Sequence, residues 1–264
     1  MKIVSWNVNG IRARKDEVAA FLERERPDVL CMQELKATPD QIPEILSKPA
    51  GYWCYWHGSK GYSGVSLHVH KEQCADPPRF WHPDFDHETR VVMADLGRVS
   101  IASLYVPNGG KNYEAKLGFL RALEDFVASA RAVGKQIILC GDINIARTEE
   151  DVHPKLRDPR VIGQRPEERA FFASILEKGN LRDVGRELDP ENFSLYTWWA
   201  PWRNMRQRNM GWRLDYMLAS QEVASKAIRA KVERETTTSD HGPVIIELAI
   251  DEVISGPPAA PEGV

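Results

Sequence analysis

The sequence lacks the features of several protein classes. No uninterrupted apolar run approaches the ~18 residues that indicate a membrane span, and the N-terminal residues show no signal-peptide pattern. The four cysteines are far apart and form no CxxC motif. Cys31 and Cys140 lie within apolar runs, where a small buried thiol is expected. We therefore expect a protein without a membrane segment, in a reduced, cytoplasmic setting.

Positive charge is not in excess either. The 264 residues include 35 Lys and Arg against 38 Asp and Glu, which gives a formal net charge of −3, and the pI is near 6.2. This balance argues against a protein that coats nucleic acid through bulk positive charge. It does not exclude an enzyme with a local basic surface, because an acidic metal site subtracts several charges from the total.

A linker and an internal repeat are also absent. No stretch rich in Ser, Gly and Pro interrupts residues 1–250, so we predict a single domain there. No self-similarity is visible at a fixed period. Residues 251–264 are rich in Pro and Gly and are expected to form a disordered tail. With 42% hydrophobic and 28% charged residues, the composition is that of a globular protein.

Runs of β-branched and aromatic residues bounded by turn residues predict strands, and apolar residues at helical spacing predict helices. The expected strands are 2–6, 28–33, 62–69, 90–94, 99–106, 136–140, 213–219 and 244–249. The expected helices are 12–26, 112–133 and 166–178. Consecutive strands without intervening helices argue against a simple parallel sheet. We predict an α/β fold in which two mixed sheets pack face to face with helices outside.

Polar residues that bind metals or activate water stand at or inside these strands. They are Asn7, Glu34, Asp142, Asn144, Asp215 and His241. Strand ends of stacked sheets converge on one edge, so residues scattered over the whole chain can share one pocket. Acid, amide and histidine groups at such an edge suit a divalent ion and a phosphodiester.

Three of these residues have a structural interpretation as well. Glu34 follows a buried strand, where it is either a Mg²⁺ ligand or a helix cap or surface acid. Asp142 and Asn144 are two residues apart and point the same way in extended backbone. They either hold and deprotonate a water molecule or form an Asx turn.

The same choice applies to Asp215, which lies mid-strand, where Asp is disfavoured. A buried Asp needs a partner. One candidate is His241, which the acid would orient and keep protonated, so that the imidazolium stabilises a phosphate. The other candidate is the neighbouring Arg213, in a purely structural ion pair. A Ser–His–Asp nucleophile is not favoured, because no GxSxG motif is present.

A second group of residues indicates the ligand. Segment 193–212 is rich in tryptophan and arginine, with Trp198, Trp199, Trp202, Arg203, Arg206, Arg208 and Trp212. Aromatic rings stack on bases and arginines bind phosphates, although at least one Trp is expected to belong to the core. Tyr105, Asn108 and Lys111 are further candidates for phosphate contact.

Taken together, these segments resemble the exonuclease III family of apurinic/apyrimidinic (AP) endonucleases. The matching motifs run in the family's order over nearly the whole chain: Ser5-Trp6-Asn7-Val8-Asn9-Gly10-Ile11-Arg12, Gln33-Glu34, Tyr105-Val106-Pro107-Asn108-Gly109, Gly141-Asp142-Ile143-Asn144, Tyr196-Thr197-Trp198-Trp199, Gly211-Trp212-Arg213-Leu214-Asp215-Tyr216 and Ser239-Asp240-His241. The resemblance implies a four-layered α/β sandwich. It also implies Mg²⁺-dependent hydrolysis of DNA on the 5′ side of an abasic site, with 3′-exonuclease or 3′-phosphatase activity.

The resemblance also implies a role for each matching residue. Glu34 would bind Mg²⁺, or Mn²⁺ as a substitute, with Asn9 and Asp240 nearby. Asp142 would activate or orient the water, helped by Asn7 and Asn144. The remaining roles are phosphate contact by Tyr105 and His241, orientation of His241 by Asp215, and DNA contact by Asn108, Lys111, Trp198, Arg203 and Trp212. The implied partner is double-stranded DNA with abasic sites or blocked 3′ ends, bound by a monomer.

One stretch departs from the family pattern. In residues 151–163 the expected amides appear as Pro154 and Asp158, and the expected small residue before Gly163 appears as Ile162. A bulky apolar group near the pocket would hinder an internal abasic site, which leaves open an enzyme specialised for 3′ ends. Two further alternatives are a phosphodiesterase of the same superfamily that acts on another substrate, and a DNA-binding or scaffold protein without catalysis.

Overall fold

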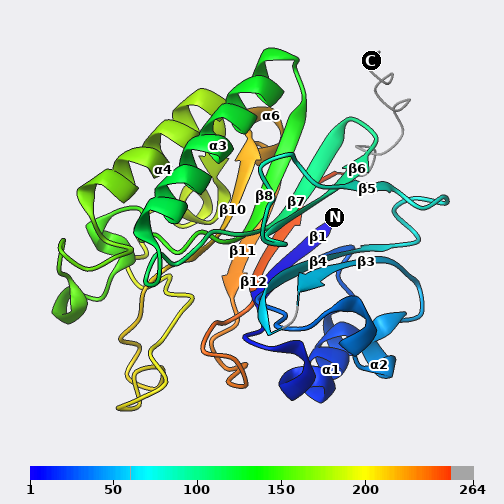
Figure 1. Ribbon diagram of the computed structural model, residues 1–264, viewed down its shortest axis with the longest axis horizontal. Helices are drawn as coiled ribbons and strands as arrows, with labels where there is room; N and C mark the ends of the chain where they lie inside the picture. The colour runs from blue at the N-terminus through cyan, green and yellow to red at the C-terminus, as the bar shows by residue number, and fades with distance from the viewer. Residues whose placement is uncertain (60, 251–264) are drawn as a thin grey trace.

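The computed structural model describes residues 1–59 and 61–250. Two six-stranded sheets form its centre (Figure 1). The first has the order β11 (Ala227–Val232), β12 (Val244–Leu248), β1 (Lys2–Asn7), β2 (Val29–Gln33), β4 (Tyr62–His70) and β3 (Tyr52–Ser59). The second has the order β5 (Arg79–Trp81), β6 (Val91–Leu96), β7 (Val99–Tyr105), β8 (Gln136–Asp142), β10 (Asp215–Ser220) and β9 (Leu181–Asp183). Both sheets are mixed, because β1–β2 and β7–β8 are parallel and the other pairs antiparallel.

Helices cover the outer faces of the two sheets (Figure 1). These are α1 (Lys15–Glu25), α3 (Tyr113–Ala132), α4 (Pro166–Gly179) and the short α2 (Glu44–Ser47). The short helices α5 (Val184–Leu188) and α6 (Gln221–Ala224) instead contribute Val184, Val223 and Ala224 to the apolar cluster between the sheets. Short 3₁₀ turns lie at Ile11–Arg14, Pro39–Gln41, Glu149–Asp151 and Pro154–Leu156. No helix in residues 1–59 and 61–250 is both long and apolar enough to cross a membrane.

Three apolar clusters hold the four layers together. One contains residues of both sheets, such as Cys31 of β2 and Cys140 of β8, and lies between them. A second joins α3 and α4 to the second sheet, and a third joins α1 and α2 to the first sheet. The central strands of each sheet are therefore buried on both faces, which explains their continuous apolar runs. The predicted sandwich of two mixed sheets with outer helices is confirmed.

Local features explain where two helices begin and end. The Asn112 side chain accepts the backbone N–H of Ala115 at 3.0 Å and caps α3. Residues 12–26, expected as one helix, begin with the 3₁₀ turn Ile11–Arg14 and continue as α1. Arg26 then adopts a left-handed conformation with φ of 43° and closes α1 before Pro27. The predicted disordered tail, 251–264, lies outside the described residues.

Candidate active site

Strand pairing in the second sheet places three candidate residues side by side. In the parallel register Tyr105 of β7 is paired with Asp142 of β8, and in the antiparallel register Asp142 is paired with Asp215 of β10. Two carboxylates directly opposite each other repel, so this arrangement needs compensating donors. The first sheet contributes one of them, because the Asn7 amide at the end of β1 donates to Asp142 Oδ2 at 2.9 Å.

The Asp142 carboxylate is held on both oxygens. Oδ1 accepts the backbone N–H of Asn144 at 2.9 Å, and Oδ2 accepts the Asn144 amide at 3.2 Å as well as that of Asn7. Asn144 turns back in a left-handed conformation with φ of 55°, and thereby forms the Asx turn foreseen as an alternative. Burial raises the pKa of Asp142 to about 7, against the opposing effect of His241. The Asx turn and the candidate catalytic role of Asp142 and Asn144 are therefore compatible, because the same hydrogen bonds form the turn and hold the carboxylate.

Asp215 has His241 as its partner. Nδ1 of His241 lies 2.8 Å from Asp215 Oδ2, and the Thr197 hydroxyl donates to the same oxygen at 2.6 Å. Nε2 of His241 lies 3.9 Å from Asp142 Oδ2. Burial alone lowers the pKa of His241, but the charge and hydrogen bond of Asp215 outweigh burial and raise it to about 10. The imidazole is therefore a cation that faces the Asp142 carboxylate.

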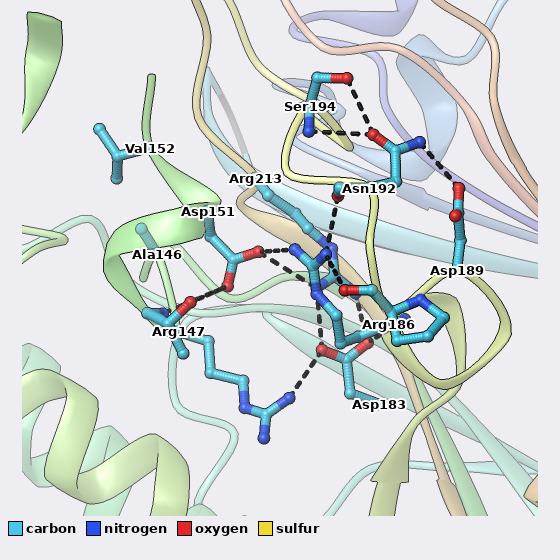
Figure 2. Close-up of polar contacts among 12 residues, drawn as sticks. Ala146, Arg147, Asp151, Val152, Asp183, Arg186, Asp189, Asn192, Ser194 and Arg213 are labelled. Carbon is cyan, nitrogen blue, oxygen red and sulfur yellow. Dashed lines mark hydrogen bonds and ion pairs between the residues drawn. The ribbon is translucent and has the colours of Figure 1, made fainter. Parts of the chain in front are cut away.

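The alternative partner of Asp215, Arg213, is engaged elsewhere. Figure 2 shows its guanidinium between the carboxylates of Asp151 and Asp183, and Nη1 lies 3.3 Å from Asp151 Oδ1 and 2.9 Å from Asp183 Oδ2. Arg147 and Arg186 approach the same two acids from outside. This ion network ties the segment after β8 to the start of β10. The structural interpretation of Asp215 as the partner of Arg213 was wrong.

Glu34 lies at a sharp turn after β2 with φ of 57°. Its Oε1 lies 3.0 Å from Nζ of Lys36, and the same Nζ donates to Asn9 Oδ1 at 2.6 Å. The Asn9 amide donates in turn to Asp240 Oδ1 at 2.8 Å, and Trp198 Nε1 donates to Asp240 Oδ2 at 2.9 Å. The carboxylate oxygen of Glu34 and the amide oxygen of Asn9 thus both contact the ammonium group of Lys36.

These donors fit a hard cation. Mg²⁺ takes one or two carboxylates together with water and phosphate oxygens, and the oxygens of Glu34 and Asn9 already share the ammonium group of Lys36. Asp142, Asp215 and His241 form a second group whose potential ligand atoms lie within 4.8 Å of one another. In that group, Asp215 Oδ2 and His241 Nδ1 already bind each other. The Glu34 side is therefore the better cation site.

Tyr105 is almost fully buried beside the acids. Burial and the charges of Glu34 and Asp142 raise the pKa of its phenol, so the hydroxyl stays protonated. The guanidinium of Arg90 lies 5.0 Å from the centre of the Tyr105 ring and donates to the Tyr62 hydroxyl at 2.7 Å. Tyr105 thus offers a protonated hydroxyl as a hydrogen-bond donor at the end of β7.

Two tryptophans flank the acids in the edge-to-face arrangement that aromatic pairs prefer. The ring centres of Trp198 and Trp212 lie 5.7 Å apart. Isolated bridges pair Trp212 with Val152, Trp198 with Trp212, and Trp198 with His241. Trp199, in contrast, is buried, as was expected of at least one Trp.

Ile162 lies close to the loop that follows β7. A Cβ atom added to Gly109 would lie 3.3 Å from Cγ2 of Ile162, and one added to Gly163 would lie 3.1 Å from the Trp212 ring. The divergent residue therefore lies against the loop after β7, and its neighbour Gly163 lies against Trp212.

Three other predicted DNA-contacting residues lie outside the hydrogen-bond network of the acids. The Asn108 side chain accepts the N–H of Gly110 at 3.0 Å, and Lys111 lies over the Tyr62 ring at 5.8 Å. Arg203 is exposed in the loop between Trp199 and Trp212, in a left-handed conformation with φ of 55°. These side chains are free to meet a ligand rather than part of the central hydrogen-bond network.

Sequence reasoning missed two residues of this network. Thr197 fixes Asp215, and its own hydroxyl accepts the backbone N–H groups of Leu214 and Asp215. Lys36 holds the oxygens of Glu34 and Asn9. Thr197 lies inside a family motif, and Lys36 lies only two residues after Glu34. Their positions in or beside these motifs were the only sequence features that could have indicated a role in the site.

Comparison with known proteins decides the family. A family model described as the Endonuclease/Exonuclease/phosphatase family matches residues 4–241. The chain belongs to this family. It is 32% identical to the Exodeoxyribonuclease of Bacillus subtilis over 258 residues, which cover 95% of this chain and 100% of the relative. Recombination repair protein 1 of Drosophila melanogaster is also 32% identical over 93% of this chain, but the match covers only 37% of that longer protein.

Solved structures agree with this assignment. The 3′ phosphatase NExo from Neisseria, bound to a product DNA hairpin, superimposes with a TM-score of 0.83 at 31% identity, over 95% of this chain and 100% of that one. An AP endonuclease from Archaeoglobus fulgidus gives a TM-score of 0.83 at 27% identity, with the same coverage of 95% and 100%. The resemblance predicted from sequence motifs is confirmed. The family members compared thus include both an enzyme for 3′ ends and an AP endonuclease.

Proposed function

We propose that the protein is a DNA repair nuclease that uses Mg²⁺, with Mn²⁺ as a substitute, to hydrolyse the phosphodiester on the 5′ side of an abasic site in double-stranded DNA. One observation carries this proposal: an Asp142 carboxylate held by two amides faces the His241 imidazolium, with 3.9 Å between Oδ2 and Nε2. A base for water and a cation for phosphate thus stand next to each other. The Trp198–Trp212 pair borders the same centre and suits a DNA sugar or base.

Asp142 orients the attacking water and accepts its proton. A carboxylate with a pKa of about 7 is matched to this task near neutral pH. The amides of Asn7 and Asn144 hold the carboxylate in one orientation, so a water bound to it approaches the phosphorus from a fixed direction.

His241 and Tyr105 stabilise the negative charge that develops on the phosphate oxygens. Asp215 accepts the Nδ1–H of His241 and leaves Nε2–H free for a phosphate oxygen. Tyr105 offers its hydroxyl proton, which the raised pKa retains. Glu34 would hold Mg²⁺, with Asn9 and Asp240 beside it. When bound, the ion supplies positive charge to the phosphate and its leaving oxygen.

One observation favours a second candidate function, the processing of 3′ ends by a phosphatase or exonuclease. Ile162 lies against the loop after β7, and the adjacent Gly163 lies against the Trp212 ring; at this place a bulky side chain would reduce the space for an abasic sugar that continues into DNA on both sides. A terminal nucleotide or a 3′-phosphate needs less room. We therefore propose 3′-end processing as the alternative main activity of the same catalytic centre.

We also propose that residues 1–250 act as one domain and as a monomer in the cytoplasm. Every candidate catalytic residue named above comes from one chain. The four cysteines are free, and Cys31 and Cys140 are buried, which suits a reducing compartment.

Three DNA duplexes with Mg²⁺ test the proposal: one with an internal abasic site, one with a 3′-phosphate and one with a plain recessed end. The fastest turnover on the abasic duplex supports the AP endonuclease, and the fastest turnover on either end substrate supports the alternative. An inositol phosphate serves as the non-DNA substrate. Cleavage of the latter without cleavage of any duplex would contradict both proposals, and Asp142→Asn controls for contaminating nucleases.

A further inference from the structure

A buried lysine lies directly behind the active-site loops. Lys116 is on α3, and its side chain has no exposed surface. Its partner Glu168, on α4, is equally buried, and Nζ lies 2.5 Å from Glu168 Oε1. The contact is a short ion pair between two fully buried charged groups. Ionised groups are costly to bury, so the further contacts of this pair indicate what it does.

Lys116 reaches two loops that border the active site. Nζ donates to the carbonyl oxygen of Asn144 at 2.8 Å, in the turn that holds Asp142. It also lies 3.5 Å from the carbonyl oxygen of Asn108, in the loop after β7. A Cβ added to Gly109 would lie only 3.0 Å from Cδ of Lys116. The lysine stem therefore packs directly under the second loop.

Glu168 reaches a third loop. Its Oε2 accepts the backbone N–H of Gly163 at 2.6 Å and that of Arg165 at 3.1 Å. These bonds fix the turn that carries Ile162, immediately before Gly163. One buried ion pair thus connects the backbone of the Asn144 turn, the Asn108 loop and the Ile162 turn.

We propose that the Lys116–Glu168 pair positions Ile162 relative to Asn144 and thereby sets which DNA substrate the active site accepts. This inference rests on the proposed function. Apolar residues in place of a buried ion pair often leave a protein equally stable, so packing alone does not require charges here. The charged groups instead fix backbone positions. The Lys116 ammonium binds two carbonyl oxygens, and the Glu168 carboxylate binds two backbone N–H groups. Small displacements of such positioning groups have large effects on rate.

The double variant Lys116→Met/Glu168→Gln tests the proposal. It keeps side-chain volume and one acceptor for Gly163, but it removes both charges. We expect kcat on the preferred duplex to fall about tenfold or more, with KM changed less than about twofold, because the displaced groups act after binding. The rate on an internal abasic site relative to a 3′-phosphate should rise about threefold or more, since the Ile162 turn is released.

A second ion pair between the same helices provides the matched control. Lys178 Nζ of α4 lies 3.0 Å from Glu124 Oε1 of α3, far along both helices from the three loops. Lys178→Met/Glu124→Gln should leave the substrate ratio and kcat unchanged. An equal change of the ratio in this control, or an unchanged ratio in the folded test variant, would overturn the proposal.

Circular dichroism and thermal melting establish that each variant is folded. If the double variant does not fold, the isosteric Glu168→Gln variant carries the test under the same criteria. Wild-type protein that cleaves no DNA duplex contradicts the proposed function. Wild-type protein that cleaves DNA, with a substrate ratio insensitive to Lys116 and Glu168, contradicts only this inference.

Discussion

Asp215 accepts a 2.8 Å hydrogen bond from Nδ1 of His241, and the Thr197 hydroxyl donates to the same oxygen. This relationship leads to the first prediction. Asp215→Asn keeps the shape but presents a neutral amide, so the imidazole loses both its charge partner and its fixed tautomer. We expect kcat to fall about 100-fold or more, by analogy with other carboxylate–histidine pairs. Steady-state kinetics measure this fall, and Asp84→Asn, at an exposed acid, serves as a control without effect.

The pH dependence of kcat/KM follows from the same centre. Asp142 must be ionised to accept a proton, so activity should fall as the pH decreases through its pKa of about 7. His241 must be protonated, so activity should fall again as the pH rises through about 10. A bound cation favours the ionised carboxylate, and higher Mg²⁺ should therefore move the acidic limb downward. A profile that is flat between pH 5 and 8 at about 1 mM Mg²⁺ would argue against these roles.

Metal removal tests Glu34. Chelation by EDTA should abolish turnover, and added Mg²⁺ should restore it. Glu34→Gln keeps the hydrogen-bonding shape but loses the charge, so the Mg²⁺ concentration for half-maximal activity should rise about tenfold or more. Glu17→Gln, at an exposed acid on α1, should leave it unchanged. Calorimetric titration of Mg²⁺ gives a second readout that does not depend on turnover.

Ile162 is predicted to limit the internal abasic substrate. Ile162→Ala and Ile162→Gly enlarge the space beside Trp212, so the rate on an internal abasic site relative to a 3′-phosphate should rise about tenfold, as expected for removal of methylene groups from a pocket wall. Val161→Ala is the control, because Val161 is the exposed neighbour in the same turn. Equal ratios in all variants would show that this wall does not select substrates.

The ion network of Figure 2 predicts a stability effect. Arg213→Met leaves the buried carboxylates of Asp151 and Asp183 without their central cation. Breaking a buried pair in this way costs about 3–5 kcal/mol of unfolding free energy, or a decrease in Tm of roughly 6 °C or more for a chain of this size. Calorimetry checks this value. Arg160→Met breaks the exposed pair with Asp158 and should leave Tm unchanged.

Much of the fold could be predicted because its central strands are buried on both faces. Residues such as those of β8 are continuously apolar, and a short apolar run bounded by turn residues is readable as a strand. Strands β3, β5, β9 and β11 were missed, and all four lie at sheet edges. Strands β5 and β9 are only three residues long. Strand β3 is only half-buried, and β11 exposes Arg229 and Lys231. None of them carries the signal of a buried strand.

The candidate site was predictable where a residue type was unusual for its position. The sequence predicted Asp215 in the middle of a strand, whereas it is the first residue of β10. A buried carboxylate there still requires a partner, and the sequence limited the choice to His241 or Arg213. Only coordinates distinguish these two, because the partner of Arg213 is Asp183, 30 residues away. Lys116 and Glu168 gave no signal at all. Each reads as a surface charge on a helix, and their contact across two helices depends on tertiary packing.

The pairing of Asp142 with Asp215 across β8 and β10 also bears on how this sequence can change. Side chains alternate between the two faces of a sheet, so a single inserted or deleted residue in either strand would send one carboxylate to the opposite side. The other side chains beyond the change would exchange faces as well, and a shift in β8 could bring a side chain to the place of Gly141, where an added Cβ would collide with the backbone of Leu104. A change of length in either strand would therefore damage the interior and the catalytic centre together, so natural variation here should be confined to substitutions.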